Sequence, residues 1–180
     1  MKFSQNKGIL FWITGLSGSG KTTIGRKIKR EIIKIYGPTI HISGDDLRKI
    51  FKINKYDYKS RLEYGRKCCN FAKFITDQKI NFIFSIIGMA QSLRDWNRKN
   101  IDNYIEIYIK SNIKQILKKK IKKLYTLNKS PVVGINIKPE FPKKPNIIIN
   151  NNFSKSMNKL SEELLAKIDK VTKLNNRISR

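Results

Sequence analysis

The segment Gly15–Thr22 constrains the fold of this chain more than any other feature of its sequence. Its letters, GLSGSGKT, fit the pattern GxxxxGK[ST], a glycine-rich loop that joins the end of a β-strand to the start of an α-helix. Residues 9–14, just before it, form an apolar run that predicts a buried parallel strand. After the loop, isoleucines recur at helical spacing, at Ile24, Ile28, Ile32 and Ile35. This order of strand, loop and helix predicts a nucleoside triphosphate site.

The chemistry of such a loop follows from its geometry. Its glycines let backbone N–H groups point at phosphate oxygens, and the helix N-terminus adds a partial positive charge. We expect Lys21 to reach the β- and γ-phosphates of ATP and to act in catalysis, and the Thr22 hydroxyl to ligate Mg²⁺. The predicted phosphate-binding residues are Gly15, Leu16, Ser17, Gly18, Ser19, Gly20, Lys21, Thr22 and Thr23.

The rest of the chain alternates between strand and helix patterns, which predicts an α/β fold. Further strands are predicted at 39–42, 81–87, 104–109 and 147–149, and helices at 60–78, 92–100 and 113–125. We expect five parallel strands with helices on both faces, in a single P-loop domain over residues 1–180. Its core covers about 9–150 and its C-terminal helix about 154–174. The lysine-rich helix at 113–125 and the loop after it are expected to form a lid.

Residues 43–48 come at the carboxyl end of the second predicted strand, the edge at which open α/β sheets bind ligands. Asp45 or Asp46 could polarise an acceptor hydroxyl or hold the water shell of a metal, while the other caps the following helix. Arg48 is suited to bind an anionic group. The strand at 81–87 has no acidic residue, so the carboxylate that often helps to hold Mg²⁺ at a strand end is absent there.

Arginines after an aromatic cluster are further candidates for anion binding. Arg61 and Arg66 follow the sequence Tyr56-Asp57-Tyr58 at the start of a predicted helix. His41 has no partner histidine in the chain, so we expect it to be structural.

The net charge of +26 permits two interpretations. One is a surface that binds nucleic acid or a membrane, and the other is attraction of polyanionic nucleotides to the site. Because Lys and Arg are spread over the whole chain, we favour solvated basic faces and expect a small nucleotide as partner, with no nucleic acid. No apolar stretch is long enough to span a bilayer, and Cys68-Cys69 does not suggest a disulfide framework. We therefore expect a cytoplasmic protein without a membrane partner, and leave a homodimer open.

Taken together, several segments resemble the adenylylsulfate (APS) kinase family. They are the glycine loop after Phe11-Trp12-Ile13-Thr14, the segment Ser43–Arg48, the stretch from Tyr56 to Arg66, Lys122–Tyr125 and Val132–Ile135. The resemblance runs in order from about residue 9 to 150. It implies transfer of the ATP γ-phosphate to the ribose 3′-hydroxyl of adenosine 5′-phosphosulfate, in sulfate assimilation. It also implies that Asp45 orients or deprotonates that hydroxyl.

On the same resemblance, the acceptor is bound by residues from several segments: Gly44, Asp45, Arg48, Tyr56, Arg61, Tyr64, Arg66, Ile87, Gly88, Lys122, Val132 and Val133. Lys122 and the loop around Val132 and Val133 would form the lid over both nucleotides.

The chain departs from the family pattern on the acceptor side. Ser43 replaces an Asp, Tyr64 replaces an Asn, Lys67 replaces an Arg, and Gly88 replaces the serine that the family can carry as phosphoserine. These departures suggest an alternative, a related branch that phosphorylates cytidine diphosphoramidate for capsular polysaccharide modification. Two other classes remain: a basic nucleic-acid-binding P-loop protein, favoured only by the charge, and a nucleotide-binding protein without turnover. APS is the first expectation for the acceptor.

Overall fold

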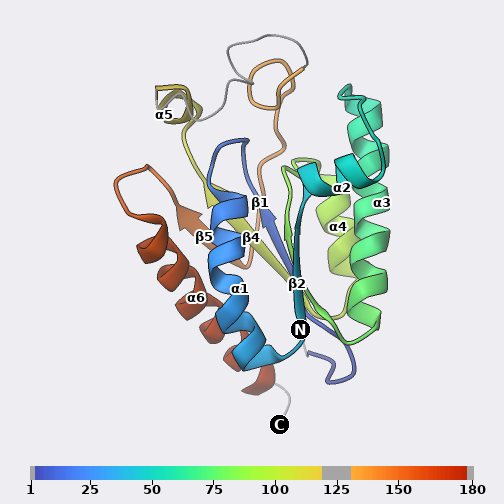
Figure 1. The fold of residues 1–180 in the computed structure, drawn as a ribbon, viewed down its shortest axis with the longest axis vertical. Coiled ribbons are helices and arrows are strands. Elements are labelled where there is room, and N and C mark those ends of the chain that lie inside the picture. Colours follow the sequence, from blue (N-terminus) through green and yellow to red (C-terminus); the bar gives the residue numbers. More distant parts are fainter. Residues whose placement is uncertain (1–2, 119–130, 178–180) are drawn as a thin grey trace.

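The computed structural model describes residues 3–118 and 131–177 (Figure 1). In this part of the chain, five strands form one sheet: β1 (Leu10–Thr14), β2 (Thr39–Ser43), β3 (Asn81–Ser85), β4 (Tyr104–Lys110) and β5 (Ile147–Asn150). The helices are α1 (Lys21–Tyr36), α2 (Gly44–Ile50), α3 (Tyr58–Asp77), α4 (Gln91–Asn100), α5 (Ile113–Lys118) and α6 (Met157–Arg177). The strand order is β2-β3-β1-β4-β5, and every neighbouring pair is parallel. This confirms the predicted five-stranded α/β fold.

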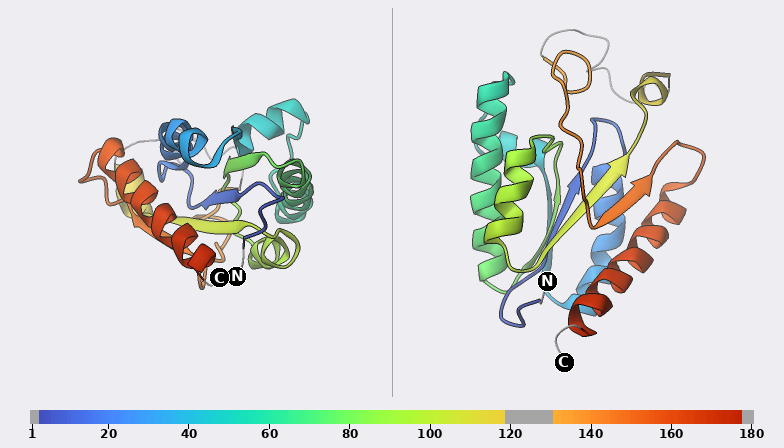
Figure 2. Two further views of the ribbon diagram at one scale, coloured as in Figure 1. Left: turned by 90° about the horizontal axis from the view of Figure 1, so that it is seen from below. Right: turned by 180° about the vertical axis from the view of Figure 1, so that it is seen from behind.

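Side chains of β1 alternate between the two faces of the sheet because successive strand residues point to opposite sides. Phe11 and Ile13 pack in one core with buried residues of α1 and α6. Leu10 and Trp12 pack in a second core with residues of α3 and α4. Figures 1 and 2 show α1 and α6 over one face of the sheet and α3 and α4 over the other. Cover on both faces explains why the inner strands are apolar with little alternation.

Strand β3 ends at Ser85, two residues before the predicted end at Ile87. The Ile86 N–H donates a last hydrogen bond to the Ile13 carbonyl, at 3.0 Å, and the chain then leaves the ladder. The apolar run continues past the strand because Ile86 and Ile87 form the wall of two cavities at the sheet edge. A hydrophobic pattern alone therefore overestimates the length of this strand.

Other boundaries differ for local reasons. Helix α3 begins at Tyr58 rather than residue 60 because Asp57 caps it, with Oδ1 accepting from the Ser60 N–H at 2.9 Å. Helix α5 ends at Lys118, and the remainder of the predicted helix at 113–125 lies outside the described residues. Helix α6 begins at Met157 instead of residue 154.

In the described parts of the chain, no helix is both long and apolar enough to cross a membrane.

Cys68 and Cys69 lie on α3, buried and free, as their apolar surroundings predict. Burial raises the pKa of both thiols to about 12, because a thiolate is costly to form away from water. They serve as small core residues.

Candidate active site

The glycine loop at the end of β1 has the geometry of an anion cradle. Gly20 caps α1 in the left-handed region, at φ 95°, without any side-chain cap, and the first turn of α1 has no acidic residue. Gly15 has no room for a side chain, since a Cβ there would lie 2.6 Å from the Ile109 carbonyl oxygen. A glycine cap and a first turn without acidic residues therefore make this end of the helix favourable for phosphate.

A cavity of about 670 Å³, counting space open to solvent, lies in front of this loop. The predicted residues Ser17, Gly18, Gly20, Lys21, Thr22 and Thr23 line it. Gly15, Leu16 and Ser19 do not; Leu16 and Ser19 are buried behind the loop and shape it from within. The Lys21 ammonium donates to the Leu16 carbonyl at 2.7 Å, which holds its charge against the loop. We refer to this space as the loop cavity.

The loop cavity offers few ligands for a metal. Among the described residues, no cluster of three His, Cys, Asp or Glu side chains could hold an ion. Besides several other hydroxyls, the Thr22 hydroxyl and the Asp45 carboxylate line this cavity, and both suit Mg²⁺. Ser85, at the end of β3, also lines this cavity, and its Oγ donates to the Lys21 carbonyl at 3.2 Å. This set fits an ion held largely by substrate phosphates and water, which is how Mg²⁺ is commonly bound.

The two adjacent aspartates after β2 have different surroundings. Ser43, not an aspartate, is the N-cap of α2, which corrects the prediction that Asp45 or Asp46 caps the helix. Its hydroxyl accepts from the Asp46 N–H at 3.2 Å, and the Asp46 carboxylate accepts from the Ser43 N–H at 3.0 Å. The Ser43 hydroxyl also donates to the Asp46 carboxylate at 2.7 Å, and this bond, with the one from the Ser43 N–H, lowers the pKa of Asp46 because both stabilise its charged form. Asp46 thus serves the capping box, while Asp45 lines the loop cavity.

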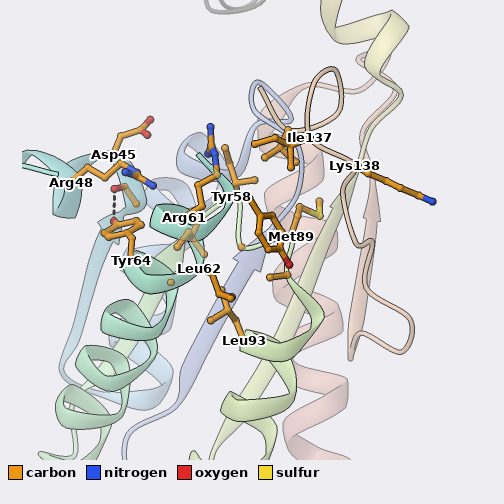
Figure 3. Close-up of a pocket in the computed structure, with 17 residues that line it drawn as sticks. Asp45, Arg48, Tyr58, Arg61, Leu62, Tyr64, Met89, Leu93, Ile137 and Lys138 are labelled. Carbon is orange, nitrogen blue, oxygen red and sulfur yellow. Dashed lines mark hydrogen bonds between the residues drawn. The ribbon is translucent and has the colours of Figure 1, made fainter. Parts of the chain in front are cut away.

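A second cavity of about 700 Å³, again including open space, adjoins the first (Figure 3). Its polar side chains are Asp45, Arg48, Tyr58, Arg61, Tyr64 and Lys138, and its apolar walls include Leu62, Met89, Leu93 and Ile137. Both cavities share Gly44, Asp45, Ile86 and Ile87. The Asp45 carboxylate therefore stands where they meet. We refer to this second space as the acceptor cavity, because a carboxylate between two nucleotide-sized spaces suits transfer from one to the other.

Arginines and tyrosines form a layered stack on one side of the acceptor cavity. The Arg48 guanidinium lies between two rings, 4.7 Å from the centroid of Tyr56 and 4.1 Å from that of Tyr64. The Arg61 guanidinium lies 5.3 Å from the centroid of the Tyr56 ring, and its Nε donates to the Tyr56 carbonyl at 2.6 Å. Burial and the nearby Arg48 charge lower the pKa of Arg61. Stacking uses the faces of each guanidinium, and part of each edge is used within the protein: Arg48 Nη1 donates to the Lys55 carbonyl at 3.1 Å and Arg61 Nη2 to the Pro131 carbonyl at 2.7 Å.

Tyr64 connects this stack to the aspartate. Its hydroxyl donates to the Gly44 carbonyl at 2.6 Å, and its side chain is buried (Figure 3). Gly44 directly precedes Asp45 in the chain, so Tyr64 fixes the backbone that carries the carboxylate.

The remaining predicted acceptor residues fall into three groups. Ile87, Gly88 and Val133 line the acceptor cavity. Three do not line it: Val132 is buried, Tyr56 contacts Arg48 and Arg61 outside the lining, and Arg66 is exposed on α3, so the structure does not bring Arg66 to the site. Lys122 lies outside the described residues.

Several residues that line the acceptor cavity belong to no recognisable sequence motif. Tyr58, Met89, Leu93, Ile137 and Lys138 line the acceptor cavity, but only Tyr58 and Met89 adjoin segments that the sequence singled out. Ile137 and Lys138 belong to the loop between β4 and β5, whose position depends on contacts with residues about fifty positions earlier.

Comparison with known proteins identifies the group to which this architecture belongs. The family model described as adenylylsulphate kinase matches residues 7–150. The cytidine diphosphoramidate kinase of Campylobacter jejuni is 36% identical over 168 residues, which cover 91% of this chain and 98% of that protein. An adenylyl-sulfate kinase of Oceanobacillus iheyensis is 29% identical over 153 residues, covering 81% of this chain and 77% of its own.

Solved structures agree on the fold. The Mycobacterium tuberculosis APS kinase, determined with AMPPNP and APS, superposes with a TM-score of 0.80 at 21% identity, covering 91% of this chain and 98% of that one. The family model covers most of the chain, and the two relatives, matched over 98% and 77% of their own length, are named as kinases. The chain therefore belongs to the adenylylsulphate kinase family and is a P-loop phosphotransferase, as its motifs predict.

Proposed function

We propose that this protein transfers the γ-phosphate of ATP to the ribose 3′-hydroxyl of cytidine diphosphoramidate. The observation that carries the proposal is the 36% identity to a cytidine diphosphoramidate kinase over 98% of that protein, against 29% for the adenylyl-sulfate kinase. This favours the alternative acceptor over APS, which was the first expectation. The Tyr64 ring in the cavity wall also supports it, because a bulky side chain there suits a pyrimidine, the smaller of the two bases.

In the proposed reaction, ATP lies with its phosphates in the loop cavity and the acceptor lies in the acceptor cavity. The 3′-oxygen forms a bond to the γ-phosphorus, the bond from that phosphorus to the β-γ bridging oxygen breaks, and ADP leaves. Asp45 accepts the hydroxyl proton and later releases it to water. Lys21 and the N–H groups of α1 stabilise the charge that spreads over the phosphate oxygens.

Mg²⁺, held by Thr22 and the phosphates, would supply additional charge neutralisation. We propose that the remaining donors of Arg48 and Arg61 bind the anionic end of the acceptor, so that the hydroxyl is held next to Asp45. Most of the rate enhancement then comes from positioning and fixed charge, as is usual for phosphoryl transfer.

A second candidate acceptor is APS, favoured by the match of the family model to residues 7–150. The same groups would act on its 3′-hydroxyl. The two acceptors differ in base and in the group attached beyond the α-phosphate, so turnover separates them.

The test is ADP release by the purified protein with Mg-ATP and one acceptor at a time. We expect kcat/KM for cytidine diphosphoramidate to exceed that for APS by about 100-fold, the discrimination that a shaped pocket can supply. Preference for APS would replace the proposed acceptor by the second candidate. Absence of turnover with both would contradict the proposed function.

Matched variants of the adjacent aspartates test the role of the carboxylate. Asp45→Asn should lower kcat by about 100-fold or more, the usual contribution of a general base. Asp46→Asn, one residue along, weakens only the capping box and should leave kcat within a few fold. If Asp45→Asn raised the KM for ATP and left kcat unchanged, Asp45 would belong with the metal instead.

A further inference from the structure

Arg94 is a fully buried cation next to Leu93, which lines the acceptor cavity. It lies on α4 with none of its surface exposed. Its Nε lies 3.5 Å from the carboxylate of Glu106, which is itself buried on β4. A buried charge of this kind is costly to maintain and costly to leave unpaired, so its hydrogen bonds show what it holds in place.

The donors of Arg94 reach two segments that are far apart in sequence. One terminal nitrogen donates to the Gly88 carbonyl at 2.8 Å. The other donates to the Glu140 carbonyl at 2.6 Å and to the Gln91 side chain at 2.7 Å. Only the planar fork of a guanidinium provides donors in this arrangement.

Further bonds join the same two segments. The Glu140 N–H donates to the Met89 carbonyl at 2.9 Å, and the Gln91 N–H donates to the Glu140 carboxylate at 2.7 Å. Residues 88–91 and 137–140 therefore form one unit, which we call the clamp, with Arg94 at its buried end.

Both halves of the clamp are walls of the acceptor cavity. Gly88 and Met89 line it from one side, and Ile137 and Lys138 from the other. Neither half lines the loop cavity. Residues 138–146 contain no helix or strand, so their position depends on hydrogen bonds and packing contacts with other segments.

We infer that Arg94 is a positioning residue for the acceptor: it holds the two walls of the acceptor cavity at a fixed separation without touching the nucleotide. The inference rests on the proposed function. It assigns acceptor affinity, and not ATP affinity, to a residue that lies below the site. A shift of about 1 Å in the walls would be enough to impair positioning of the reacting hydroxyl.

The same helix offers a matched control. Arg98 also pairs with Glu106, at 2.6 Å. It further contacts Asp95, the Tyr104 ring and the Lys144 carbonyl, none of which lines the acceptor cavity. Arg94→Lys keeps a positive charge near Glu106 and loses the fork. Arg98→Lys makes the same substitution against the same carboxylate.

Steady-state kinetics of both variants test the inference. Arg94→Lys should raise the KM for the acceptor by about tenfold or more and leave the KM for ATP within twofold. Arg98→Lys should leave both KM values within twofold, whatever its effect on Tm. Equal effects of the two variants on the acceptor KM, or an unchanged acceptor KM in Arg94→Lys, would overturn the inference.

A surface variant covers the case in which Arg94→Lys does not fold. Glu140→Ala removes the carboxylate that accepts from Gln91 without leaving a buried charge unpaired, and should raise the acceptor KM severalfold in the same selective way. An unchanged acceptor KM in this variant would then overturn the inference. Wild-type turnover is measured first, because its absence contradicts the proposed function, whereas an unchanged KM in the variants contradicts only the role of Arg94.

Discussion

At the scale of single residues, the division of labour between Asp45 and Asp46 follows from one hydrogen-bonded turn. Asp46 is the third residue of α2, and its carboxylate accepts from both the N–H and the hydroxyl of Ser43, at 3.0 and 2.7 Å. Once Asp46 is committed to the cap, Asp45 is the carboxylate that lines both cavities. The capping box therefore accounts for the orientation of Asp46, and Asp45 is the aspartate left to act in the proposed chemistry.

The hydroxyl of Tyr64 gives a prediction at this scale. Tyr64→Phe removes the 2.6 Å hydrogen bond to the Gly44 carbonyl and keeps the ring under Arg48. The loss of one buried hydrogen bond should lower the free energy of unfolding by about 1 kcal/mol. Because Gly44 carries Asp45, we also expect kcat to fall severalfold with little change in the KM for ATP. Steady-state kinetics with a thermal melt measure both, and a lower Tm with unchanged kcat would show that the bond is only structural.

The imidazole of His41 gives a second prediction. Its Nε2 lies 3.0 Å from the Ser85 hydroxyl and close to Gly25 of α1, where a Cβ would lie 2.6 Å away. Burial and the charge of Arg26 together lower the pKa of His41 to about 4, while Asp46 acts in the opposite direction. The unfolded chain therefore binds the proton more readily than the folded protein between about pH 4 and pH 6.5.

The sign of the effect follows from this difference. The contribution of neutral His41 is complete above pH 6.5 and is lost as the pH falls toward 4. We expect the stability advantage of the wild type over His41→Gln to shrink between pH 7 and pH 5, as measured by urea unfolding at each pH. A constant difference over this range would contradict the lowered pKa.

At the scale of elements, the sequence predicts those parts of the site that depend on local pattern. The strand before the glycine loop, the loop itself and α1 are all found where apolar spacing and glycine positions place them. Local pattern also predicts the apolar segment that ends in Ile86 and Ile87 but cannot show where the ladder stops, because a cavity wall and a buried strand both require apolar residues.

The acceptor side could be predicted only in part. Asp45, Arg48 and Arg61 meet at one cavity as expected, whereas Arg66 lies exposed on α3. Ile137 and Lys138 escape prediction because the loop that carries them is held by Arg94 and the Met89 carbonyl. Such contacts join segments distant in sequence and leave no periodic signal. The family resemblance supplied the acceptor residues that local pattern could not.

At the scale of the whole molecule, the topology of the sheet creates the two adjoining cavities. β1 lies between β3 and β4, so the glycine loop at its carboxyl end stands at the centre of the edge. β2 and β3 end beside it, bringing Asp45 and Ile86 to the same edge. Ligands of open α/β sheets bind at such edges. We propose that the net charge of +26, spread over the whole chain, also raises the local concentration of the anionic nucleotides proposed as substrates.

The position of the transferred phosphate tests the central claim most directly. After incubation with Mg-ATP and cytidine diphosphoramidate, phosphorus–proton coupling in the NMR spectrum of the isolated product identifies the carbon that bears the new phosphate ester. Lys21→Met, which lacks the ammonium at the loop, serves as the control and should yield almost no product. We predict one new phosphate, coupled to the ribose 3′ proton. A phosphate at another position, or release of inorganic phosphate with an unmodified acceptor, would contradict the placement of the acceptor hydroxyl next to Asp45.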